Sequence, residues 1–295
     1  MIKLSLLLAG LLLMFSCHSQ KKETQAVKAK QVLIKDSTDN AAFQKVKKLT
    51  ADKQFGQLAI GERIVNIGKQ FLDVPYVGAT LEKGEEHLVI NLHELDCTTF
   101  LESTVALGRS SGDLSQANFA SALQQLRYYN GKIDGYTSRI HYFGQWIVEN
   151  EKLGVVENIS KELGGEKLPL NVNFMSTHVK SYKALKNDTS LVPIIAEHEK
   201  ELNKSTLFYV PENKLKSVEQ KVQNGDLIAI TTSIKGLEIS HVGIAIQVND
   251  RLHLMHASSK AKKVVISDMP LAEMLLKNRL QTGVVVVRVK KYWNE

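Results

Sequence analysis

The stretch from Asn91 to Glu102 reads NLHELDCTTFLE, and it contains the residue on which the interpretation of the whole chain depends. Cys97 is one of only two cysteines in 295 residues, and the other, Cys17, lies near the N-terminus. The run CTTFLESTVALGRS has apolar residues at helical spacing, and Asp96 before it is a typical N-cap residue. We therefore predict a helix whose first turn carries Cys97 and whose N-cap is Asp96.

The N-terminus predicts export. A short positive region, Met1–Lys3, precedes the 12-residue apolar run Leu4–Phe15, which is too short to span a bilayer but suits a secretory signal. Ser16 then precedes Cys17, as in a bacterial lipoprotein signal, where the cysteine is lipidated. We expect a signal peptide over residues 1–16, a lipid anchor at Cys17 and a periplasmic or cell-envelope location. An ordinary cleaved signal is the alternative.

Composition and charge describe a globular enzyme-sized chain rather than a nucleic-acid binder. Hydrophobic residues make up 43%, and 38 Lys+Arg against 31 Asp+Glu give a net charge of +7. No basic stripe studded with aromatic residues is present, so we expect no nucleic acid among its partners. The polar, aperiodic residues 17–45 predict a flexible tether, and residues 46–295 a single, monomeric catalytic domain.

An unpaired thiol in an exported chain is either reactive or buried and inert. In the first turn of a helix, Cys97 meets free backbone N–H groups and the positive end of the helix dipole, and both favour the thiolate. A thiol nucleophile needs this environment, and the N–H of Cys97 can also stabilise an oxyanion. The alternative is a small buried apolar residue, which is the usual fate of a cysteine.

The fold class follows from a change in the spacing of apolar residues along the chain. Helical spacing recurs in FQKVKKLTA, in IGERIVNIGKQFL and in the Cys97 helix, and the insertion over about 114–210 is largely helical. Five strand-like runs follow: GDLIAITTS, SHVGIAIQV, RLHLMHAS, KVVISD and GVVVVRVKKY. Asn249-Asp250 predicts a hairpin turn between the second and third runs. We predict an α+β fold, with N-terminal helices packed on a C-terminal antiparallel sheet.

Two of the nine histidines are candidates for catalysis. His241 opens a strand of small apolar residues and can act as a base for a distant thiol. With two-residue alternation, the hairpin brings His256 near His241 as an orienting group and places His253 on the other face, as a surface residue. A zinc site of these three histidines is the weaker alternative, because alternation separates them and no carboxylate or thiol lies at ligand spacing.

Five motifs in order resemble the NlpC-type cell-wall peptidases, which have a papain-like fold. The motifs are VPYVGAT, LDCTTFLE, GDLIAI, SHVGIAI and HLMHASS, and the resemblance covers roughly residues 60–289. It implies a Cys-His-His triad of Cys97, His241 and His256, with a thioester intermediate. Residues that the resemblance places in the site or against the substrate are Tyr76, Asp96 and Ser240.

Two departures point to a particular branch of that superfamily. DCTT replaces the usual DCSG, and about 140 residues separate the thiol from His241. The insertion resembles the exported N-acetylmuramoyl-L-alanine amidase-like proteins, which implies cleavage of the amide between N-acetylmuramic acid and L-alanine in peptidoglycan fragments. Arg139, His141 and Tyr142 would then help to form the pocket; a structural loop with a solvated arginine is equally open. We expect no cofactor and no metal.

Two other functions remain open. A stem-peptide endopeptidase would use the same three residues and differ only in its pocket contacts. A non-catalytic wall-binding lipoprotein would keep the fold, although it has no reason to retain all three groups.

Overall fold

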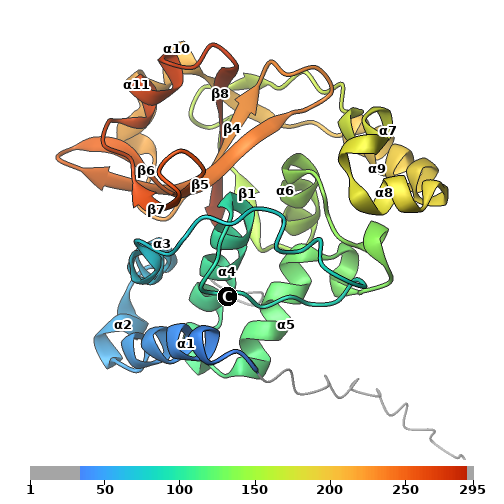
Figure 1. The fold of residues 1–295 in the computed structure, drawn as a ribbon. Coiled ribbons are helices and arrows are strands. Elements are labelled where there is room, and N and C mark those ends of the chain that lie inside the picture. Colours follow the sequence, from blue (N-terminus) through green and yellow to red (C-terminus); the bar gives the residue numbers. More distant parts are fainter. Residues whose placement is uncertain (1–33, 291–295) are drawn as a thin grey trace, which may run out of the picture.

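An antiparallel sheet of eight strands forms the centre of the computed structural model, which describes residues 34–290 (Figure 1). The strand order is β2-β3-β8-β4-β5-β6-β7, and β1 also pairs with β8. The strands are β1 (Val156–Asn158), β2 (Glu166–Lys167), β3 (Phe208–Pro211), β4 (Leu227–Thr232), β5 (Ile239–Val248), β6 (Arg251–Ser258), β7 (Lys263–Ile266) and β8 (Gln281–Val289). The predicted α+β class with an antiparallel sheet is confirmed.

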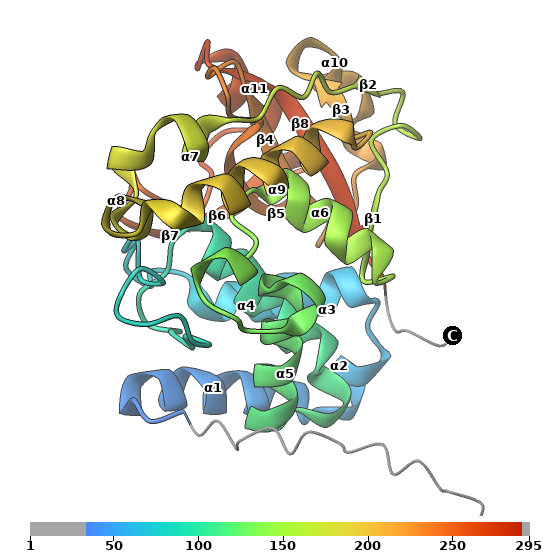
Figure 2. The same ribbon diagram turned by 90° about the vertical axis from the view of Figure 1, so that its right-hand side faces the viewer.

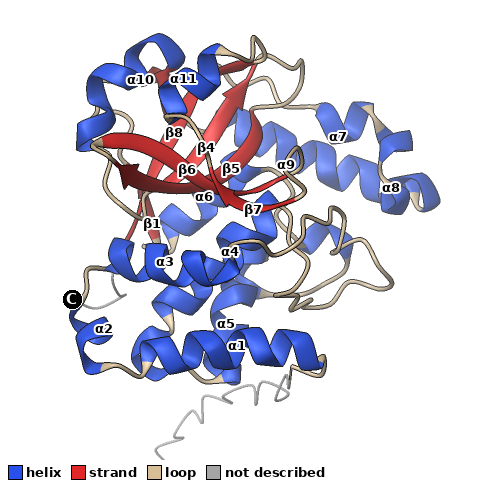
Figure 3. Cartoon of the chain, turned by 60° about the vertical axis from the view of Figure 1, so that its left-hand side comes forward, coloured by secondary structure: helices blue, strands red, loops and turns tan. Residues whose placement is uncertain are grey.

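The two faces of the sheet are covered by different helices because their buried residues alternate along the strands. Ile228 and Ile230 of β4 pack with α10 (Glu212–Val218) and α11 (Leu271–Leu276). Leu227 and Ala229 of the same strand pack on the opposite side, in the core shared with α3 (Ile60–Gly68) and α4 (Cys97–Arg109). Figure 3 shows α3 and α4 below the sheet and α10 and α11 above it.

The N-terminal helices begin earlier than the sequence predicts. Helix α1 spans Ser37–Thr50, with Asp36 as its N-cap, and α2 spans Lys53–Gln57. Phe43 and Val46 of α1 are buried in the main core. The expected tether over residues 17–45 is therefore wrong for its last nine residues, because this amphipathic helix packs on the domain. The signal peptide, Cys17 and most of the tether lie outside the described residues.

The insertion contributes strands as well as helices. Its helices are α5 (Gln116–Arg127), α6 (Phe143–Lys152), α7 (Phe174–Thr177), α8 (Lys183–Asn187) and α9 (Val192–Lys204). Its short 3-10 turns are η3 (Tyr129–Gly131), η4 (Tyr136–Ser138), η5 (Val179–Ser181) and η6 (Thr189–Leu191). Three more lie outside the insertion: η1 (Lys69–Phe71), η2 (Ser111–Asp113) and η7 (Glu219–Lys221). Strands β1 and β3 both pair with β8, so the insertion extends the sheet. Figures 1 and 2 show α7, α8 and α9 packed together at one side of the molecule.

The β5–β6 hairpin turns where predicted. Asn249 and Asp250 both have positive φ, 49° and 59°, as tight two-residue hairpin turns require. The prediction for His253 is wrong: its side chain is buried, and its Nδ1 lies 2.7 Å from the Ser267 carbonyl oxygen. Ser267, in the segment after β7, contacts His253 on the face where we expected solvent. Among residues 34–290, no helix is both long and apolar enough to cross a membrane.

Candidate active site

Cys97 is the first residue of α4, and the predicted cap is confirmed. The Asp96 Oδ1 accepts a hydrogen bond of 2.8 Å from the Thr99 N–H. The Asp96 N–H in turn donates to the Thr99 hydroxyl at 2.9 Å, which completes a capping box. The second threonine of DCTT therefore has a structural task, since it satisfies a backbone donor that the helix start leaves free.

The thiol is neutral in the free protein, contrary to the expectation from its helical position. Burial, followed by the Asp96 carboxylate, raises the pKa of Cys97 to about 11. Donation from the backbone N–H groups of Val242 and Thr98 lowers it by less. The carboxylate that caps the helix thus opposes the thiolate that the helix end would favour.

His241 and His256 form a hydrogen-bonded pair on one face of the β5–β6 hairpin. His241 Nε2 lies 2.6 Å from His256 Nδ1, and the rings meet edge-on at 85°. Burial lowers the pKa of His241 to about 3 and that of His256 to about 4, so both imidazoles are neutral at pH 7. In a neutral pair, one ring donates and the other accepts, so the tautomer of each ring determines that of the other. The sequence predicted this meeting from strand alternation.

A pocket of about 280 Å³ brings most of the predicted residues together. Those that line it are Asp96, Cys97, Arg139, His141, Tyr142, Ser240 and His241. The Val242 N–H, next to His241, points at the Cys97 sulfur. No hydrogen bond joins that sulfur to the His241 imidazole in the part of the chain that the structure describes. Such bonds are often loose without substrate.

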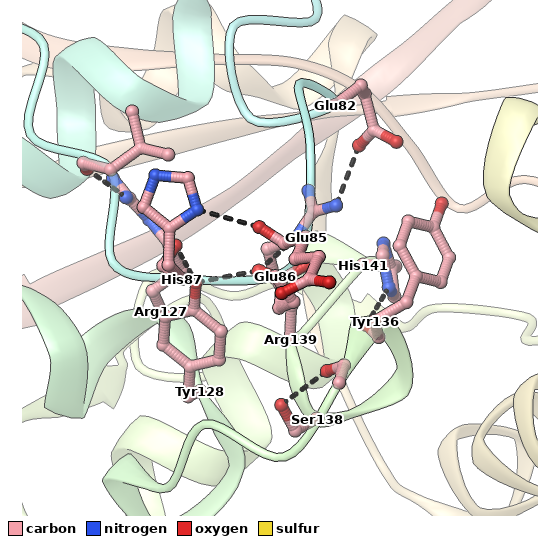
Figure 4. Close-up of polar contacts among 12 residues, drawn as sticks. Glu82, Glu85, Glu86, His87, Arg127, Tyr128, Tyr136, Ser138, Arg139 and His141 are labelled. Atoms are coloured by element: carbon pink, nitrogen blue, oxygen red, sulfur yellow. Dashed lines mark hydrogen bonds and ion pairs between the residues drawn. The ribbon is translucent and has the colours of Figure 1, made fainter.

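The wall opposite the histidines is held by a buried arginine (Figure 4). Arg139, 8% exposed at its side chain, donates to Glu82 at 2.7 Å and pairs with Glu86 at 3.2 Å. Glu86 also accepts from the Tyr128 hydroxyl at 2.7 Å. The alternative of a solvated arginine is wrong: Arg139 ties the loop of residues 78–91 to the insertion.

His141 and Tyr142 are also bonded within the protein. His141 Nε2 lies 2.9 Å from the Tyr136 carbonyl oxygen (Figure 4), and burial, reinforced by Arg139, lowers the pKa of His141 to about 3. Tyr142 donates from its hydroxyl to Glu199 at 2.7 Å. Both side chains border the pocket while being fixed from behind, so they shape it rather than move into it.

Sequence reasoning missed Glu238, which lies two positions before Ser240 and lines the same pocket. Its Oε1 accepts from the Gly144 N–H at 2.9 Å, while its Oε2 is buried without a partner among the described residues. Burial raises the pKa of Glu238 to about 7. The signal available in the sequence was a carboxylate close to the start of the histidine strand.

Tyr76 lies beside the pocket rather than in its lining. Its backbone bridges to Leu95, just before the cap. Burial raises the pKa of Tyr76, and the nearby Cys97 and Asp96 raise it further. Tyr76 is therefore near the thiol, although we expected it in the lining of the site itself.

One group with metal-ligand spacing occurs among the described residues: Asp36, Asp39 and His93. Asp39 Oδ1 already accepts from the Leu92 N–H and lies 2.6 Å from His93 Nδ1. These bonds tie α1 to the segment that precedes Cys97, which gives the group a structural explanation. His241, His253 and His256 form no such group among the described residues, because His253 points elsewhere.

Comparison with known proteins assigns the chain to a family. The model of the AmiA-like family, described as N-acetylmuramoyl-L-alanine amidase-like, matches residues 66–284. This match covers most of the chain, which therefore belongs to the N-acetylmuramoyl-L-alanine amidase-like family. A comparison with curated proteins gave no match.

Solved structures agree with this assignment. The structure of a N-acetylmuramoyl-L-alanine amidase from Bacteroides uniformis is 40% identical, with a TM-score of 0.76, over 79% of this chain and 99% of that one. A protein from Bacteroides fragilis described as a candidate xylanase is 41% identical, with a TM-score of 0.72, over 75% and 99%. A Legionella pneumophila protein, 22% identical over 85% and 95%, shares the fold with a TM-score of 0.66.

Proposed function

We propose that the protein is a cysteine amidase that hydrolyses the amide between N-acetylmuramic acid and L-alanine in peptidoglycan fragments. One observation carries this proposal: Cys97, at a capped helix start, shares a pocket with His241, which is hydrogen-bonded to His256. Membership of the amidase-like family supplies the class of bond.

The mechanism follows from the neutral states of the three groups. If His241 Nε2–H donates to His256 Nδ1, the Nδ1 of His241 keeps its lone pair and can take a proton. His241 then deprotonates Cys97 as the sulfur attacks the amide carbonyl. The oxyanion is held by the Cys97 N–H, with the Tyr76 hydroxyl as second donor. His241 returns its proton to the leaving amine, and water hydrolyses the thioester.

The proposed fold type is papain-like, of the NlpC kind. It is supported by a helix that starts at the thiol and packs on an antiparallel sheet in which strand β5 carries His241.

The pocket also contains five aromatic side chains, Tyr136, Tyr142, Phe143, Trp146 and Tyr182. Aromatic faces suit the apolar faces of a sugar ring, so we assign this pocket to the acyl half, with the sugar.

We assign roles to the other predicted contact residues according to whether their polar groups are already bonded within the protein. Ser240 is exposed at the pocket and is proposed to contact substrate directly. Asp96 is committed to the cap and Arg139 to two glutamates, so we propose that they act through the shape of the pocket. His141 is proposed to contact the sugar through its ring.

We further propose that the protein is exported to the periplasm or cell envelope and is anchored by lipid at Cys17. This residue lies outside the described part of the chain, and the proposal rests on the apolar run before it. Metabolic labelling with a radioactive fatty acid tests it: wild type is expected to incorporate label, and Cys17→Ala is expected not to. Equal labelling would contradict the anchor.

Product analysis tests the reaction. Purified protein is incubated with a muramyl tripeptide, and the products are identified by mass spectrometry. Release of an intact L-alanyl peptide and free N-acetylmuramic acid is expected. Cleavage between stem residues would replace the amidase with an endopeptidase. Xylan serves as a control substrate and is expected to remain intact, because the proposed chemistry acts on an amide.

A further inference from the structure

A second hollow borders the histidine pair on the side away from the thiol. It has a volume of about 760 Å³ and is formed by the end of β6, the turn into β7, the residues after β7, α11 and the start of β8. His241 lines both hollows, His256 lines only this one, and Cys97 lines only the first. Resting on the amidase reaction above, we propose that this hollow receives the leaving stem peptide and pairs its carboxylates with Lys260 and Lys277.

The direction of the reaction places the peptide on this side. In acyl transfer from an amide, the acyl half becomes attached to the nucleophile, while the base gives its proton to the departing amine. The acyl half must therefore lie at Cys97, and the amine must lie within reach of His241. The hollow that begins at His241 and continues along His256 is where a peptide would extend from that amine.

The charges of the two hollows agree with this placement of the acyl half and the peptide. Lys260 and Lys277 are exposed, and neither has an ion-pair partner among residues 34–290. Lys263, in the same turn region, is by contrast paired with Asp73 at 2.6 Å. Asp268 is the one acidic side chain that lines this hollow. Two unpaired cations at the rim suit a peptide that carries several carboxylates.

The first pocket has the opposite character. Its arginines are neutralised: Arg127 pairs with Glu102 at 2.7 Å, and Arg139 pairs with two glutamates. Asp96 and Glu238 add further carboxyl groups to its lining. The cations that line the first pocket are already paired, so the carboxylates of a stem peptide are better matched by the second hollow.

Calorimetry on the full chain tests this assignment. The protein carries Cys97→Ala so that no turnover occurs, and the probes are a synthetic L-alanyl stem tripeptide and its analogue with every carboxylate converted to carboxamide. We expect the acidic peptide to bind about tenfold more tightly at low salt, because two exposed ion pairs each contribute modestly. Adding K260Q and K277Q should abolish this preference, so that the two peptides bind with about equal affinity.

A charge-matched control uses K48Q and K53Q, which remove two exposed lysines from α1 and α2, neither of which lines the hollow; both helices lie below α3 in Figure 1. It should keep the tenfold preference. The same preference in K260Q/K277Q would overturn the assignment, as would equal binding of both peptides to the Cys97→Ala protein. Failure of the wild type to cleave muramyl peptides would reject the amidase reaction instead, and the two failures are therefore distinguishable.

Discussion

The two walls of the thiol pocket are built in different ways. The reactive wall joins the start of α4 to the β5–β6 hairpin, and each part follows from residues adjacent in sequence: a capped helix and a two-residue turn. The opposite wall joins residues 78–91 to the insertion through Arg139, whose partners Glu82 and Glu86 lie more than fifty residues away. The Cys97, His241 and His256 side chains of the reactive wall are neutral at pH 7, whereas the opposite wall depends on buried charge.

We infer from this difference that the reactive wall determines the rate of the reaction and the opposite wall the shape of the pocket. Substitutions on the reactive wall should change the rate and leave the fold intact, because its helix and hairpin are stabilised by other residues. Substitutions on the opposite wall should change stability first, because a buried charge would lose its partner.

The largest effect is expected at His241. His241→Ala should lower kcat for muramyl peptide hydrolysis by about 1,000-fold, since a general base contributes about 10² to 10⁴ and here no other base lines both hollows. Steady-state kinetics measures the loss, and thermal melting should show a folded protein. A kcat within tenfold of wild type would remove His241 from the mechanism.

The opposite wall should respond through stability. Arg139→Met should lower the free energy of unfolding by about 3 kcal/mol, because it leaves Glu86 buried without its cation. Urea denaturation measures this change. Lys200→Met, which removes an exposed cation paired with Glu197, is the control and should cost less than about 1 kcal/mol. Equal effects would mean that the wall does not depend on buried charge.

The neutral state of the thiol can be tested by alkylation. Because the pKa of Cys97 is raised to about 11, its thiolate fraction should grow about tenfold per pH unit between pH 7 and pH 9. The rate of inactivation by iodoacetamide in the absence of substrate should rise in proportion. A rate that is already constant below pH 7 would indicate a preformed thiolate–imidazolium pair.

The smallest effect concerns the contact that holds α1 to the segment before Cys97. Its hydrogen bond with Asp39 raises the pKa of His93 in the folded protein above its usual value of 6.5. The stabilisation is complete below pH 6.5 and is lost as pH rises through the folded pKa. Urea unfolding measures the free energy of unfolding of wild type and His93→Gln at pH 6 and pH 9. Between these values wild type should lose more than the variant, by up to about 1 kcal/mol. Parallel pH dependence would contradict this.

Local signals explain why much of the reactive wall could be predicted. Asp96 before an apolar periodic run predicts a cap, and alternation along the hairpin predicts the meeting of His241 with His256. The raised pKa of Cys97 could not be predicted, because burial and the Asp96 carboxylate outweigh the local N–H groups. The helix over Ser37–Thr50 could be predicted only in part, because the apolar spacing of FQKVKKLTA indicates its second half, whereas its polar start resembles a tether.

The opposite wall could not be read from sequence because its contacts are long-range. Nothing near Arg139 identifies Glu82 and Glu86 as its partners, so a solvated arginine and a pocket residue were equally plausible. Glu238 was missed for a related reason: its role depends on burial against Gly144 of the insertion. The short strands β1 and β3 were missed because pairing with β8, rather than local pattern, defines them.

The central claim is that Cys97 is the nucleophile of an amidase. The most direct measurement compares kcat/KM of wild type and Cys97→Ala on a muramyl tripeptide, with release of the L-alanyl peptide followed by mass spectrometry. We predict that the substitution abolishes peptide release, because it removes the sulfur that forms the acyl intermediate. Full activity of Cys97→Ala would contradict the thiol mechanism.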